Sequence, residues 1–101
     1  MVISASYRRA PENPYPAALE DCFAVLGLID RNADLLEADA TRIAVAGDSA
    51  GGCLATALAM MVRDRGGPAI RLQALLYPCI DTNFERHSTC VTLTRCCRMR
   101  R

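Results

Sequence analysis

The residues with the clearest chemical potential lie in the run 47–51, which reads Gly-Asp-Ser-Ala-Gly. The spacing Gly-x-Ser-x-Gly is typical of a strained turn between a strand and a helix, which exposes the serine hydroxyl at the end of a sheet. A helix that begins at Ala50 would direct its first N–H groups and its positive dipole end at the same point, where they can stabilise an oxyanion. The pattern therefore predicts Ser49 as a nucleophile and the Ala50 N–H as an oxyanion donor.

Two other interpretations of this turn stay open. A glycine-rich turn can serve packing alone, or it can bind a phosphate at the N-terminus of the following helix. The run contains no lysine of the kind found in phosphate-binding loops, and it lacks the Gly-x-Gly-x-x-Gly spacing of a dinucleotide site. These differences favour the nucleophile.

An alternating series of elements would place this turn at a sheet edge. Apolar residues at helical spacing predict helices, and short apolar runs bounded by proline or glycine predict strands. The series is a strand at 2–6, a helix at 17–31, a strand at 43–47, a helix at 50–65 and a strand at 70–77. The order predicts an α/β fold with a parallel sheet of about three strands and two to three helices. The run 43–47 does not alternate, which is typical of a strand covered on both faces.

Length and composition limit the chain to one domain. It has 101 residues, of which 51% are hydrophobic and 23% charged, and its formal net charge is +1. This composition is globular, and the mixed charge argues against a nucleic-acid partner. No signal peptide follows Met1 and no apolar run is long enough to span a membrane, so a cytoplasmic location is expected. Only the tail carries charge of a single sign, and it is either a basic arm or a solvated terminus. Its charged residues are Arg95, Arg98, Arg100 and Arg101.

Six cysteines raise the question of disulfides or a metal site. Without a secretion signal, disulfides are not expected. Cys22, Cys53 and Cys79 lie in apolar segments, where a free cysteine behaves as a small hydrophobic residue. The other three lie near the only histidine but lack paired Cys-x-x-Cys spacing, so no metal site is predicted. These four residues are His87, Cys90, Cys96 and Cys97.

Four ordered motifs span most of the chain. They are Tyr7-Arg8-Arg9-Ala10-Pro11-Glu12, then Pro14-Tyr15-Pro16-Ala17-Ala18 with Asp21, then Gly47-Asp48-Ser49-Ala50-Gly51-Gly52, then Tyr77-Pro78 with Asp81. Together they resemble the hormone-sensitive-lipase-like branch of the α/β-hydrolases over residues 2–85, and 86–101 form a divergent tail of one incomplete domain. Two positions depart from the family's pattern, since Ser6 stands where an aspartate is common and Arg9 where a leucine is.

The resemblance implies a serine carboxylesterase or lipase of three-layer α/β/α architecture that acts on a small-molecule ester with a short acyl group and needs no cofactor. Ser49 would attack the ester carbonyl as a histidine takes its proton, an acyl-enzyme would form, and water would release the acid. The Ala50 N–H would be one oxyanion donor. The rest of the nucleophile elbow would be formed by Gly47, Asp48, Gly51 and Gly52. The two glycines that flank the serine, Gly47 and Gly51, are expected to prevent collisions with the adjoining strand and helix.

The resemblance also implies that most of the catalytic site is missing. In this family the triad acid and histidine follow well beyond the third strand, and a His-Gly-Gly-Gly oxyanion loop should precede Met1. His87 is interpreted as a surface residue, and neither Asp81 nor Asp48 stands at the position of the triad acid. Because triad members act as a unit, the isolated chain is expected to be nearly inactive. A truncated or frame-shifted sequence would explain both ends.

A structural gap is implied as well. The strand that carries the oxyanion loop should lie between the strands at 2–6 and 43–47. Its loss is expected to leave a slot of roughly 10 Å, or to force these two strands to pair. Unpaired edges favour association, so poor stability or an oligomer through exposed sheet edges is predicted. In the tail, residues 93–95 align with the family's next helix.

Two functional hypotheses from different classes result. The first is an incomplete serine esterase whose full-length form hydrolyses carboxylic esters. The second is a non-catalytic α/β fragment that acts through protein contacts at its sheet edges. A peptidase or thioesterase on the same fold is disfavoured by the motif at 7–12.

Overall fold

The structure, a computed structural model, describes residues 1–80 and 92–94. The helices predicted at 17–31 and 50–65 and the strands predicted at 43–47 and 70–77 are confirmed to within one residue. In chain order the elements are α1 (Ala17–Arg31), the 3-10 helix η1 (Ala40–Arg42), β1 (Ile43–Asp48), α2 (Ala50–Arg65), β2 (Ile70–Leu76) and β3 (Thr92–Thr94).

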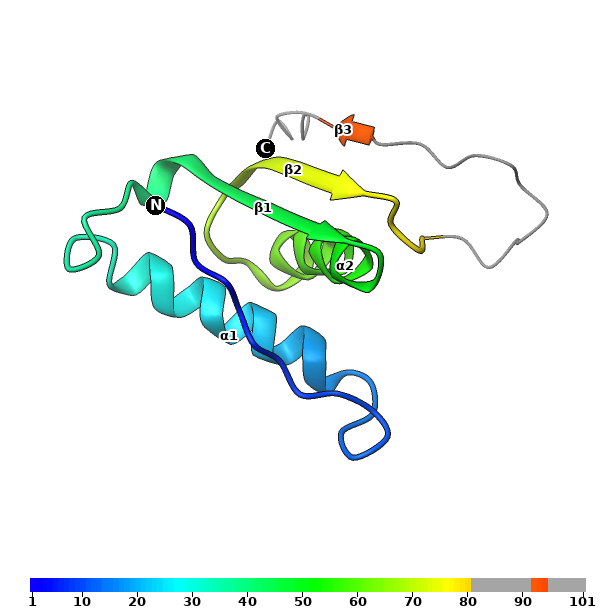
Figure 1. Cartoon of the computed structure of the whole chain (residues 1–101). Helices are drawn as coiled ribbons and strands as arrows, with labels where there is room; N and C mark the ends of the chain where they lie inside the picture. Colours follow the sequence, from blue (N-terminus) through cyan, green and yellow to red (C-terminus); the bar gives the residue numbers. More distant parts are fainter. Residues whose placement is uncertain (81–91, 95–101) are drawn as a thin grey trace.

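The sheet has the strand order β1-β2-β3, and both helices lie on one side of it (Figure 1). β1 and β2 are parallel and are joined through α2, which packs against both strands, while α1 packs against α2. The described residues therefore form two of the three layers of the expected α/β/α architecture. The prediction that β1 is covered on both faces is wrong for this part of the chain, because both helices lie on the same side. Its other face stays exposed at Ala44, Ala46 and Asp48.

The strand predicted at 2–6 does not form. Residues 1–9 have no regular secondary structure, and among the described residues none of 1–6 takes part in a backbone–backbone hydrogen bond. The sequence there is β-prone, but a strand also needs a neighbour whose N–H and C=O groups can pair with its own. Val2 is 95% exposed, so the segment gains little from packing either.

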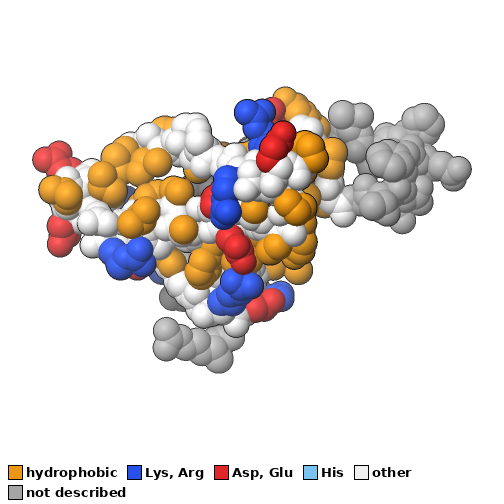
Figure 2. All heavy atoms as spheres, turned by 90° about the horizontal axis from the view of Figure 1, so that it is seen from below, with side chains coloured by type: hydrophobic (Ala, Val, Ile, Leu, Met, Phe, Trp, Pro, Cys, Tyr) orange, Lys and Arg blue, Asp and Glu red, His pale blue; other side chains and the backbone are white. Residues whose placement is uncertain are grey.

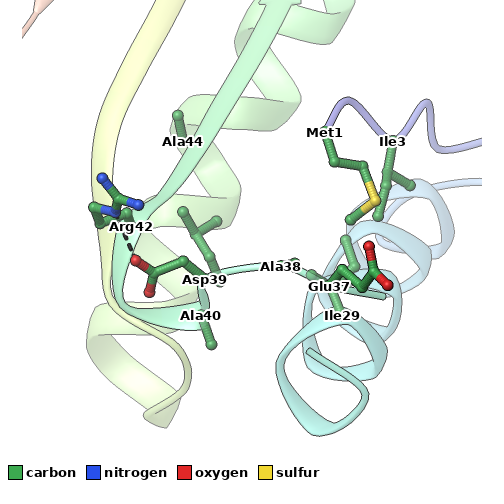
Figure 3. A pocket seen from close by; sticks show the side chains of 10 residues that line it. Met1, Ile3, Ile29, Glu37, Ala38, Asp39, Ala40, Arg42 and Ala44 are labelled. Carbon is green, nitrogen blue, oxygen red and sulfur yellow. Dashed lines mark hydrogen bonds and ion pairs between the residues drawn. The ribbon is translucent and has the colours of Figure 1, made fainter. Parts of the chain in front are cut away.

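The space between this segment and β1 is open. A cavity of about 520 Å³ lies there, and Figure 3 shows Met1 and Ile3 on one side of it and Ala44 on the other. Asp39 and Arg42 form an ion pair of 2.6 Å near its β1 side. The chain thus leaves a gap where the resemblance implies a missing strand, and the two segments do not pair with each other.

The second difference from expectation is β3. The resemblance predicts a helix at residues 93–95, but the structure places Thr92–Thr94 as a strand that runs antiparallel to β2. The edge of β2 offers backbone partners there, and this pairing decides the local structure. Several residues considered above lie outside the described residues. They are Asp81, the four members of the possible metal cluster (His87, Cys90, Cys96 and Cys97) and the arginines of the tail from Arg95 on.

The core is small. It consists of buried Leu19, Leu26 and Leu58, with half-buried apolar side chains from both helices and both parallel strands around it. No large side chain of the described residues is less than 2% exposed. Figure 2 shows hydrophobic side chains on the surface seen from below, with acidic and basic side chains next to one another between them. Such a thin core predicts marginal stability.

Candidate functional site

Ser49 occupies the turn between the end of β1 and the start of α2. Its backbone has φ 47° and ψ −115°, a left-handed conformation that costs a non-glycine residue about 1–3 kcal/mol. The turn is held on both sides, because the Ser49 N–H donates to the Leu76 carbonyl at 2.9 Å and the Cys53 N–H donates to the Ser49 carbonyl at 3.1 Å. The Ser49 side chain makes no capping hydrogen bond, and the residue is exposed. Its hydroxyl is therefore free to meet a ligand.

Two glycines permit this turn sterically. A Cβ at Gly47 would lie 2.3 Å from the carbonyl carbon and oxygen of Gly51, and a Cβ at Gly52 would lie 2.9 Å from the Cβ of Pro78. At Gly51 the nearest atom to an added Cβ is an Asp48 carboxylate oxygen at 3.8 Å, which is an ordinary contact. Close packing thus requires Gly47 and Gly52, and the expectation that both glycines flanking the serine prevent collisions is wrong for Gly51.

The start of α2 supplies the electrostatics of the site. The helix runs for 16 residues from Ala50, and its first residues leave their N–H groups without intrahelical partners. These groups and the positive end of the helix dipole favour negative charge next to Ser49. The arrangement suits a substrate carbonyl oxygen that becomes an oxyanion.

Pro78 explains why the motif after β2 belongs to the site. Tyr77 has φ 37°, which turns the chain sharply after β2, and Pro78 then packs on Gly52 in the first turn of α2. Pro78, which belongs to the motif after β2, therefore supports the turn at Ser49 by packing against the start of α2.

A salt bridge fixes the loop before α1. The Arg8 guanidinium donates to the Asp21 carboxylate at 2.8 Å, and the Arg8 backbone N–H donates to it at 2.9 Å. These hydrogen bonds hold the pKa of Asp21 below its ordinary value. Both residues lie in the motifs that carry the resemblance, but their contact was not predicted. Two opposite charges 13 positions apart in the sequence do not by themselves show that the side chains meet.

The described residues hold only part of the predicted catalytic site. They contain no histidine, and Asp48 is exposed at the turn. Residues 1–80 and 92–94 also contain no group of three side chains arranged to hold a metal ion, and neither helix described there is long and apolar enough to cross a membrane.

The three cysteines in the described segments are free thiols. Cys22 and Cys53 are half-buried, and burial raises the pKa of Cys22. Cys79 lies in an apolar segment and was expected to behave as a small hydrophobic residue, but it is exposed and not buried.

Comparison with known families gives a match over residues 1–97, and the matching family is described as the α/β hydrolase fold. The match includes part of the 86–101 tail.

Curated relatives carry esterase names. A carboxylesterase, NlhH, from Mycobacterium tuberculosis is 50% identical over 78 residues, which is 77% of this chain and 24% of the relative. An ethyl acetate hydrolase from Pseudomonas putida is 41% identical over 88 residues, covering 86% of this chain and 28% of the relative. The chain thus spans about a quarter of the length of these relatives.

Solved structures agree with them. A bacterial heroin esterase superposes with a TM-score of 0.74 at 41% identity, covering 79% of this chain and 25% of that protein. An esterase from the archaeon Pyrobaculum calidifontis superposes with a TM-score of 0.68 at 50% identity, covering 71% of this chain and 24% of the esterase.

Proposed function

This chain belongs to the α/β-hydrolase fold family, in the hormone-sensitive-lipase-like branch that its motifs predict, and from that premise we propose that it carries the nucleophile of a carboxylic ester hydrolase. The observation that supports this proposal most strongly is Ser49 itself. Its exposed hydroxyl stands in a left-handed turn at the N-terminus of α2. The esterase names of relatives at 41–50% identity point to the same chemistry.

In the proposed reaction the Ser49 hydroxyl oxygen attacks the ester carbonyl carbon while a histidine of the whole protein, other than His87, accepts its proton. The Ala50 N–H then stabilises the tetrahedral oxyanion. The alcohol leaves with the proton from the histidine, and water hydrolyses the acyl-enzyme by the same steps in reverse order. Gly47, Asp48, Gly51 and Gly52 complete the elbow, and no cofactor takes part.

A graft tests this proposal. The segment 2–79 would replace its aligned counterpart in a carboxylesterase of this family, and hydrolysis of p-nitrophenyl butyrate would be measured. We expect the graft to be active and Ser49→Ala to lower kcat by about 10⁴-fold or more. Ser6→Ala, a matched change at another exposed serine, should leave kcat unchanged. A folded graft without activity, or an active Ser49→Ala graft, would contradict the proposal.

The open edge of β1 supports a second proposal for the isolated chain, namely association through exposed sheet edges. The free side of β1 carries no strand in the described part of the chain, and the cavity of about 520 Å³ lies beside it. An edge of this kind accepts another strand. Light scattering during size-exclusion chromatography tests it: we expect oligomers, whereas a monomer with a sharp, reversible unfolding transition would contradict this.

A cytoplasmic location stays a prediction from the sequence, and the free thiols of the described cysteines are compatible with a reducing compartment. Fluorescent tagging of the full-length protein tests it.

A further inference from the structure

Two of the described cysteines, Cys53 and Cys79, face one cavity although they come from different segments of the chain. Cys53 lies near the start of α2, and Cys79 lies in the segment that follows β2. Both residues line a cavity of about 420 Å³ beside the elbow, and both are free thiols. The two thiols therefore border the same open space.

A contact between their neighbours in sequence limits the distance between the two cysteines. A Cβ at Gly52 would lie 3.2 Å from the Cα of Pro78, and each of these residues directly precedes one of the cysteines. Because consecutive Cα atoms are about 3.8 Å apart, the Cα atoms of Cys53 and Cys79 are at most about 12 Å apart. A disulfide needs a Cα separation of roughly 4.4–6.8 Å, so the two residues have to approach each other by no more than about 5 Å.

The segment that carries Cys79 can make this approach. Residues 77–80 follow the end of β2 at Leu76, and none of them belongs to a helix or strand. In the described part of the chain their one backbone–backbone hydrogen bond runs from the Ile80 N–H to the Pro78 carbonyl at 3.0 Å, within the segment itself. Cys53 is held in α2, where its N–H donates to the Ser49 carbonyl. Cys79 can therefore move toward Cys53 without breaking a backbone hydrogen bond to the sheet.

The difference in exposure gives the two thiols different roles. Cys79 is exposed, whereas Cys53 is half-buried, so a dissolved disulfide reaches Cys79 first. An accessible cysteine beside a second cysteine that can resolve its adduct is the usual arrangement of a redox-sensitive pair. Cys22 differs from both, because it packs against the core and burial raises its pKa, which lowers its reactivity near neutral pH.

We propose that Cys53 and Cys79 form a dithiol site that glutathione disulfide, or another small disulfide, oxidises to an intramolecular disulfide. The Cys79 thiolate attacks one sulfur of glutathione disulfide, which forms a mixed disulfide and releases one glutathione thiolate. The Cys53 thiolate then attacks the Cys79 sulfur and displaces the second glutathione. The protein thiols give up two electrons and two protons, and glutathione disulfide takes them up as two molecules of glutathione. In a reducing compartment a bond of this kind is transient.

The proposed bond would act next to the candidate site. It would join the segment after β2 to the start of α2, where Pro78 already packs on Gly52. Ala50 lines the same cavity, so the bond would lie beside the turn at Ser49. Its chemistry involves the two thiols alone, and the inference therefore does not depend on the proposed ester hydrolysis.

The spacing of the cysteines provides a matched comparison for the test. Positions 22 and 53 are 31 apart and positions 53 and 79 are 26 apart, so in an unfolded chain the two disulfides should form to within about 2-fold of each other. The whole chain, with Cys90→Ser, Cys96→Ser and Cys97→Ser to remove the other thiols, would be oxidised with glutathione disulfide in the absence and presence of urea. The disulfides would be mapped by mass spectrometry after alkylation of the remaining thiols.

Without urea we expect the disulfide between Cys53 and Cys79 to be at least about 10-fold more abundant than the one between Cys22 and Cys53, because the shared cavity raises the effective concentration of one thiol at the other. In urea this preference should fall to about 2-fold or less. A preference that is no larger without urea than with it would overturn the proposal.

Single variants in the same background test the order of attack. In Cys53→Ser glutathione should remain attached to Cys79, whereas in the parent the adduct at Cys79 should be resolved and should not accumulate. In Cys79→Ser the addition of glutathione to Cys53 should be at least about 3-fold slower than its addition to Cys79 in the first variant, because Cys53 is half-buried. Glutathione that persists on Cys79 of the parent, or equal rates of addition in the two variants, would overturn the proposal.

Discussion

Two short apolar runs of this chain, Ile43–Asp48 and 2–6, have similar β-prone sequences and different fates. The first is strand β1, with six residues paired in parallel with β2. The second has no regular structure, and none of its backbone groups bonds to another backbone group in the described residues. Composition does not separate them.

Their surroundings do separate them. β1 has a strand beside it and α2 packed on one face, and it ends in the turn at Ser49. The segment at 2–6 faces β1 only across an open cavity. A run of β-prone residues thus becomes a strand when backbone partners and a packed face are present, and the following predictions test that contrast.

The largest expected effect is at the end of β1. Gly47→Ala places a Cβ 2.3 Å from the Gly51 backbone, which cannot move away without opening the elbow. We expect the variant to lose about 4–5 kcal/mol of stability, enough to unfold so small a domain, as measured by circular dichroism in urea. Gly51→Ala, where the Cβ has room, is the control and should change stability by less than about 1 kcal/mol. Similar losses in both variants would contradict the account of the elbow.

The core beneath β1 comes next. Leu26 is 4% exposed, and Leu26→Ala should cost about 3 kcal/mol, within the usual range for a buried leucine. Leu28 lies on the same helix but is 52% exposed, so Leu28→Ala should cost less than about 1 kcal/mol. Urea unfolding of both variants measures the difference, and equal losses would show that α1 is not packed as described.

A direct comparison of the two runs uses the same substitution in each. Val45→Ser removes a half-buried side chain from β1 and should cost about 1–3 kcal/mol. Val2→Ser acts on a side chain that is 95% exposed and should change stability by less than about 0.5 kcal/mol. A large loss at Val2 would mean that the segment is paired after all.

The smallest effect concerns the entry into β1. Asp39 accepts hydrogen bonds from Thr41 and Arg42, which lower its pKa from the ordinary 3.8 to about 2. Because the folded pKa is depressed, this carboxylate adds stability above about pH 4, and that contribution is lost as pH falls toward about 2.

Thermal unfolding from pH 6 to pH 2 checks this. The Tm difference between the parent chain and Asp39→Asn should be constant above pH 5 and should fall toward zero between pH 4 and pH 2. Asp30→Asn, at a carboxylate without a hydrogen bond in the described part of the chain, is the control for a general charge effect. A difference that widens at low pH would contradict the stated cause.

The sequence predicted the elements whose signals are local. The stripe containing Leu19 and Leu26 predicted α1, and Gly66 ended α2 at φ 79° as a glycine after a helix is expected to. The position of Ser49 between strand and helix followed from its spacing alone.

What the sequence did not predict depends on distant partners. The segment 2–6 does not form a strand because no neighbouring strand pairs with it, whereas β3 forms because the edge of β2 is free to pair. The contact between Arg8 and Asp21 depends on the conformation of the loop before α1. The difference between Gly51 and Gly52 also came from packing, since only Gly52 meets Pro78.

The most direct test of the central claim, that Ser49 is a nucleophile, is the site of labelling by a fluorophosphonate probe mapped by mass spectrometry. Such probes react with a serine that a base activates. In the esterase graft we predict a single adduct at Ser49, formed about 10⁴-fold faster than in the isolated chain, and none in Ser49→Ala. An adduct at another residue of the segment, or labelling that persists in Ser49→Ala, would contradict the claim.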